Sequence, residues 1–172
     1  MKKLVAMLGS LLVLASAVFA ADPAVGLWKS IDDKSGQVTA VWDIFEQDGK
    51  LFGKIVAVAD NPQNVVASAC KESYKGFPIE GAVNKMHTVG TTWIYNMSKE
   101  SAGNWKGGNI VNPGDGKMYG CVIKYMAAGS DKKAPVDTLG MAGTVGPIKV
   151  FQYWVKASEA DIADLQAKFP AK

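Results

Sequence analysis

Residues 105–121 read WKGGNIVNPGDGKMYGC, and this stretch decides the fold. Strand-forming residues run from Trp105 to Val111 and again from Lys117 onward, and the residues between them are Asn, Pro, Gly, Asp and Gly. Glycine supplies the positive φ of a tight turn, while Asn, Asp and Pro favour turns through local hydrogen bonds or a fixed φ. Because strands joined by a tight turn pair antiparallel, the stretch predicts a β-hairpin.

The same alternation and turn punctuation recur from Val25 to Lys156 and predict an all-β chain. The expected strands are residues 25–30, 37–46, 50–59, 91–98, 105–111, 117–126, 136–143 and 149–156. An antiparallel sheet of eight such strands tends to close into an up-and-down barrel, because closure removes exposed edges. A barrel of this size either fills its lumen with side chains or holds one small ligand.

An outer-membrane barrel is the competing architecture for an exported chain. Its strands alternate between lipid-facing and lumen-facing residues and end in aromatic girdles. The expected strands contain four lysines, Lys54, Lys106, Lys117 and Lys124, and the chain ends in an expected helix. Both features disfavour an outer-membrane barrel.

The first twenty residues have the composition of a secretory signal peptide. Lys2 and Lys3 precede an apolar run, and small residues follow at Ala20. We expect cleavage after Ala20, a mature chain without a membrane span, and a periplasmic or secreted location. The expected organisation is therefore a leader (1–20), a barrel domain (21–156) and a short C-terminal helix packed on the barrel (157–172).

Two segments depart from the strand rhythm. Residues 60–90 fit no single period and hold the only histidine, His87. We expect this segment to be either a functional loop with a short helix near 63–70, or a loop covalently linked to the sheet.

Residues 158–169 switch to helical spacing, with Ser158 and Asp161 placed as a capping box. A helix this short is marginal alone, so its apolar stripe must dock on the sheet.

Charge argues against nucleic acid as a partner. Loss of Lys2 and Lys3 lowers the formal net charge from +3 to +1, and all 19 basic residues are lysines. Because arginine is absent, the chain lacks the planar guanidinium group that forms bidentate hydrogen bonds with guanine and phosphate.

Two cysteines remain, Cys70 and Cys121. In an oxidising compartment such a pair tends to form a disulfide, and we expect one of structural character. Free buried thiols are the alternative.

Three stretches together resemble a bacterial domain-of-unknown-function family, numbered twenty-one forty-seven, of small exported proteins with a lipocalin-like barrel. They comprise residues 26–28 with 33–36, 44–46 and 52–55; residues 105–113 with 116–121; and residues 139–143 with 152–156. Arginines usual in the third stretch are replaced here, among them by Lys156, so no charge-based role is carried over. The resemblance implies a fold and a compartment, and no activity.

The triplet Gly26-Leu27-Trp28 also looks like the opening of the first lipocalin strand, whose Trp closes the bottom of the barrel against a cation on the last strand. Lys156 is placed to supply that cation and to stack on Trp28. This pair is expected to be structural.

No catalytic set emerges from the residue types and spacing. His87 has no base or nucleophile at a defined spacing from it. Asp43 and Glu46 point to opposite faces of one strand, so they do not form a carboxylate pair. The methionines and the histidine lack the spacing of a metal-binding pattern. We therefore expect a non-enzymatic protein without a metal or cofactor.

Aromatic residues are the remaining signal. A lumen lined by Trp42 and Trp154, with Gln152 or Lys124 as a polar group, would suit a small hydrophobic or amphiphilic ligand. A filled core is the alternative reading, because both faces of the last strand are apolar. The alternative function is binding of an envelope protein or glycan through residues 60–90, as an inhibitor does.

Overall fold

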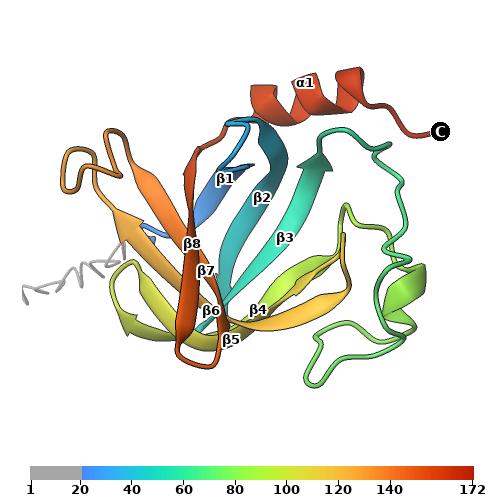
Figure 1. Cartoon of the computed structure of the whole chain (residues 1–172), viewed down its shortest axis with the longest axis horizontal. Helices are drawn as coiled ribbons and strands as arrows, with labels where there is room; N and C mark the ends of the chain where they lie inside the picture. Colours follow the sequence, from blue (N-terminus) through green and yellow to red (C-terminus); the bar gives the residue numbers. More distant parts are fainter. Residues whose placement is uncertain (1–20) are drawn as a thin grey trace, which may run out of the picture.

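The computed structural model describes residues 21–172, and the expected leader, residues 1–20, lies outside the described residues. The strands are β1 (Gly26–Ile31), β2 (Val38–Gln47), β3 (Lys50–Val58), β4 (Thr92–Ser101), β5 (Asn104–Asn112), β6 (Lys117–Met126), β7 (Thr138–Val145) and β8 (Ile148–Lys156). Each pairs antiparallel with its neighbour, and β8 returns to β1, so the sheet is a closed barrel (Figure 1). The predicted all-β, eight-stranded fold is confirmed.

The hairpin in the opening stretch joins β5 to β6 in the register Asn112↔Lys117. Gly116 has φ 67°, the left-handed region that glycine adopts without steric cost. It also lies against the backbone of Ala69 and Cys70, where a Cβ would collide with the Ala69 carbonyl oxygen. One glycine therefore allows both the turn and the close approach of a second segment.

That second segment is the connection between β3 and β4, residues 59–91. Its Phe77 packs on Trp93 and Tyr95 of β4, with ring centroids 5.8 and 5.5 Å apart. The expected helix near 63–70 is wrong, and the segment's helical turn is instead the 3-10 turn η1 (Val83–Lys85). The backbone of 65–67 pairs across to residues 86–88, which leaves its amides and carbonyls no i→i+4 partners.

The helix α1 (Glu159–Lys168) lies outside the barrel beside β1, β2 and β3 (Figure 1). Ser158 and Asp161 form the expected capping box. Asp161 also accepts a hydrogen bond from Lys29 Nζ at 2.8 Å. The side-chain amide of Gln63, in the 59–91 connection, donates to the Phe169 carbonyl at 3.0 Å. These polar contacts tie the helix to the barrel wall.

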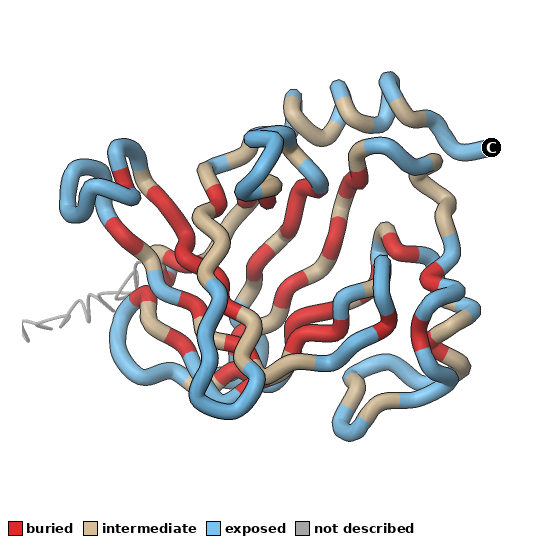
Figure 2. The backbone as a smooth tube through the Cα atoms, viewed as in Figure 1, coloured by how far each residue is buried: buried red, intermediate tan, exposed pale blue. Residues whose placement is uncertain are grey.

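One half of the barrel interior is filled by its own side chains. Large residues that are at most 1% exposed pack there; they include Trp28, Ile44, Leu51, Trp105, Ile123 and Leu139. Figure 2 shows buried residues along the strand centres and exposed residues at the hairpin between β7 and β8. We call the filled half the closed end and the other half the open end.

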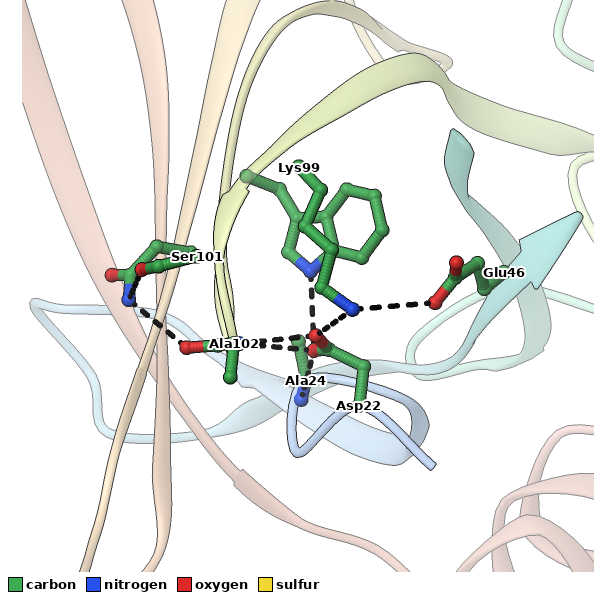
Figure 3. A network of polar contacts seen from close by, with 9 residues as sticks. Asp22, Ala24, Glu46, Lys99, Ser101 and Ala102 are labelled. Carbon is green, nitrogen blue, oxygen red and sulfur yellow. Dashed lines mark hydrogen bonds and ion pairs between the residues drawn. The ribbon is translucent and has the colours of Figure 1, made fainter. Parts of the chain in front are cut away.

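A buried carboxylate holds the closed end together (Figure 3). Asp22 accepts hydrogen bonds from the Ala24 amide at 3.0 Å, the Gly103 amide at 3.1 Å and Trp105 Nε1 at 3.1 Å. Lys99 Nζ completes the shell at 3.0 Å. Asp22 thereby fastens the segment before β1 to the β4–β5 hairpin.

Burial alone would raise the pKa of Asp22, but the hydrogen bonds from Gly103, Ala24, Lys99 and Trp105 outweigh it and hold the pKa below 3.8. A carboxyl group whose pKa is lower in the folded state stabilises the fold fully above its unfolded pKa, about 3.9. That contribution is lost as pH falls through the lower, folded-state pKa.

We expect Asp22→Asn to lower the free energy of unfolding by about 2 kcal/mol at pH 7, because the amide cannot accept from all four donors. The deficit should shrink below about pH 4, where the wild-type carboxylate becomes protonated. Urea titrations at several pH values measure this. Asp33→Asn, an exposed site, is the control, and a deficit that stays constant down to pH 2.5 would contradict the assignment.

Candidate functional site

A cavity of about 740 Å³ occupies the open end of the barrel. The strands contribute Ser30, Thr39, Ala40, Trp42, Ile55, Val58, Ile110, Asn112, Tyr119, Met141, Gly143, Val145, Ile148, Val150, Gln152 and Trp154. The connections contribute Ala59, Asp60, Asn61, Thr88, Pro113 and Gly114. Small residues of the wall, among them Ala40 and Gly143, leave part of this end unfilled. The closed end has buried side chains such as Trp28, Trp105 and Leu139 instead.

Exposure along β8 follows the depth of the cavity. Ile148, Val150, Gln152 and Trp154 alternate along the strand and all line the cavity. Ile148 and Val150 are 64% and 65% exposed, whereas Trp154 is 1% exposed. An apolar residue on the inner face of a strand is normally buried, so its exposure here marks an unfilled interior.

Two tryptophans form the deep wall of the cavity. Trp42 on β2 and Trp154 on β8 stack with ring centroids 5.1 Å apart and an interplanar angle of 25°. Trp42 Nε1 donates to Ser30 Oγ and Trp154 Nε1 donates to Gln152 Oε1, both at 3.2 Å. With the indole N–H groups satisfied by the wall, a ligand would meet mainly the carbon surface of the rings.

Three of the residues expected in the lumen therefore lie together: Trp42, Gln152 and Trp154. Lys124 does not line this cavity. On β6 the inward positions are Cys121 and Ile123, so Lys124 points outward, where it is exposed beside Phe151 and Tyr153. The expectation for Lys124 was wrong because alternation on a strand with two apolar faces does not show which face is inner.

Trp28 and Lys156 lie at the opposite, closed end. Lys156 Nζ is 3.9 Å from the centroid of the Trp28 ring, and Trp28 Nε1 donates to the Ala24 carbonyl at 2.9 Å. Burial lowers the pKa of Lys156. Neither side chain lines the cavity.

Cys70 and Cys121 are free thiols in the structure, so the expected disulfide is not present in it. Cys121 faces the interior from β6, whereas Cys70 lies in the 59–91 connection against the backbone of Gly116. Burial raises the pKa of the Cys121 thiol to about 12 and also raises that of Cys70. Neither thiol is a ready nucleophile near neutral pH, because the thiolate is the reactive form.

The described residues contain few groups for other chemistry. His87 lies in a β-bridge with Val66 and does not line the cavity. Within residues 21–172 no three His, Cys, Asp or Glu side chains gather in a way that could hold a metal ion. Over the same residues, no helix has the length and apolar character needed to cross a membrane.

Sequence reasoning missed the residues that shape the open end. Gly143, Ile148 and Val150 were counted only as strand or hairpin residues. The available signal for Ile148 and Val150 was their alternation with Gln152 and Trp154 along one strand, and Gly143 pairs with Val150 on the neighbouring strand.

A hollow open end predicts unequal costs for one substitution. Ile148→Ala should lower the free energy of unfolding by less than about 0.5 kcal/mol, because the side chain is already exposed. Ile123→Ala, at a fully buried inward position, should lower it by about 2–5 kcal/mol. Chemical denaturation of both variants measures the difference, and similar losses would show that the open end is filled.

Comparison with known proteins agrees with this geometry. No curated protein matches the chain. A solved structure, protein HP1028 from the human pathogen Helicobacter pylori, described as belonging to the lipocalin family, is 16% identical with a TM-score of 0.63. The match covers 83% of this chain and 88% of that one and shows a shared fold. The family model described as "Uncharacterized protein conserved in bacteria (DUF2147)" matches residues 26–156, and the chain belongs to this family.

Proposed function

We propose that this protein is a non-enzymatic binding protein that holds a small hydrophobic or amphiphilic molecule in the cavity at the open end. The observation that carries the proposal is the exposure of inward-facing apolar side chains, above all Ile148 and Val150. Each square ångström of apolar surface that a ligand covers contributes about 25 cal/mol. A bound ligand would therefore gain binding free energy by covering the apolar surface that is exposed in the empty cavity.

The size and lining of the cavity support a small guest. Pockets for small molecules usually measure about 300–1,000 Å³ and combine apolar walls with a few polar groups. Here the apolar wall includes Trp42, Trp154 and Met141, and polar side chains such as Gln152 and Asn112 are spaced among them. The wall offers no nucleophile paired with a base, which favours binding over catalysis.

Export remains part of the proposal. It rests on the leader-like composition of residues 1–20, which supports a location in the periplasm or outside the cell. A carrier in that compartment would shield an apolar molecule from water.

The structure gives less support to the alternative function, which is binding of an envelope protein or glycan by the 59–91 connection. The aromatic residue Phe77 of this connection faces the barrel, where it packs on Trp93 and Tyr95. Ala67, Cys70 and Val83 are also buried. Several apolar residues of the connection therefore pack against the barrel, while Val66 and Ile79 are 41% and 37% exposed.

The neutral fluorophore N-phenyl-1-naphthylamine tests the proposal. We expect saturable binding of one probe per chain, with a dissociation constant on the order of micromolar for a ligand of this size, and energy transfer from the nearby tryptophans. Gly143→Leu should weaken binding by about tenfold or more by filling the cavity. The backbone tolerates this change, because a Cβ at Gly143 would meet Tyr119 at an ordinary 3.6 Å.

Thr144→Val is the matched control, since Thr144 neighbours Gly143 on β7 and does not line the cavity. Its affinity should equal that of the wild type. Absence of saturable binding to the wild type, or equal binding by Gly143→Leu, would refute the proposal.

A further inference from the structure

The cavity has an unusual balance of charge for this chain. Lysines outnumber acidic residues by three in the full sequence, yet no lysine lines the cavity in the part that the structure describes. Among the described lining residues, Asp60 is the one with a charged side chain at neutral pH. The one formal charge among these wall residues is therefore negative.

Asp60 stands at the mouth of the cavity, two residues after β3 ends at Val58. Its side chain is exposed and makes no ion pair or hydrogen bond with any residue between 21 and 172. Other carboxylates of the barrel, such as Asp22 and Asp43, face a lysine within 3.4 Å. The Asp60 carboxylate is thus available to a guest.

The polar and apolar groups of the cavity are separated along its length. Asp60, Asn61 and Thr88 come from the connection at the mouth, and the Trp42–Trp154 stack lies deep in the barrel. Ile148 and Trp154 are six residues apart on β8, which corresponds to about 20 Å of strand. An elongated molecule with its tail on the tryptophans would place its head beside Asp60.

We propose, on the basis of the proposed function, that the cavity selects amphiphiles with a cationic ammonium head and discriminates against those with a carboxylate head. An ammonium group at the mouth is attracted to the Asp60 carboxylate. A carboxylate at the same place is repelled and finds no lysine in the wall. Head-group charge then discriminates among amphiphiles with similar tails.

Three probes built on chains of twelve carbons test this selection: dodecyltrimethylammonium, dodecanoate and dodecyl maltoside, each below its micellar concentration. Calorimetric titration of the full mature chain at low salt should show the ammonium probe binding about tenfold more tightly than dodecanoate. The ratio should fall at about 0.5 M NaCl, because salt screens exposed charges.

Variants separate Asp60 from the net charge of the protein. Asp60→Asn should bring the ratio close to one; Asn tolerates the φ of 60° at this position, so the backbone is preserved. Asp33→Asn removes the same charge from an exposed position outside the cavity and should keep the wild-type ratio. Ile148→Lys places a cation in the wall and should reverse the preference toward dodecanoate.

Equal affinities for the two charged probes, together with binding of dodecyl maltoside, would overturn the charge selection and leave the proposed function intact. A wild-type ratio in Asp60→Asn would overturn the role of this carboxylate. Failure of all three probes to bind would overturn both proposals.

Discussion

The pairing of β1 with β8 is the contact on which the rest of the structure depends. It is short, with the register Trp28↔Lys156 and Lys29↔Val155, yet it turns an open sheet into a barrel with an interior. The Lys156 ammonium over the Trp28 ring strengthens this seam from within, and Lys29 extends it outward to Asp161 of α1. Without closure, the inner faces of β2 and β8 would not meet, and Trp42 could not stack on Trp154.

The barrel interior is divided between a packed core and a cavity. At the closed end, large apolar side chains and the Asp22 hydrogen bonds provide a packed core. At the open end, small residues such as Ala40 and Gly143 leave space, and the apolar residues of β8 stay exposed. A barrel filled throughout would be more stable but would have no room for a guest.

Sequence reasoning could predict the strands and their order, because alternation and turn residues are local signals. The hairpin at 112–117 and the capping box at Ser158 belong to this class. The inner face of each strand was harder to predict, since β6 and β8 are apolar on both sides; Lys124 was therefore placed wrongly. The covering of β4 by Phe77 was also out of reach, because it depends on contacts between distant segments.

Local pattern left open whether the lumen is hollow or filled. The hollow end arises where side chains from several strands converge, and their summed size is visible only once the registers are known. The same holds for Asp60, which begins the irregular segment 60–90 in the sequence and is identified as a cavity residue only once β3 and the barrel mouth are placed.

The central claim is that the open end is an accessible binding chamber and the closed end is a solid core. Nuclear magnetic resonance of the indole and methyl groups during titration with a neutral amphiphile tests it most directly. The account predicts saturable shifts at Trp42, Trp154, Ile148 and Val150 and unchanged signals at Trp28 and Trp105. Shifts confined to the outer surface of the 59–91 connection, or none at the two stacked tryptophans, would contradict it.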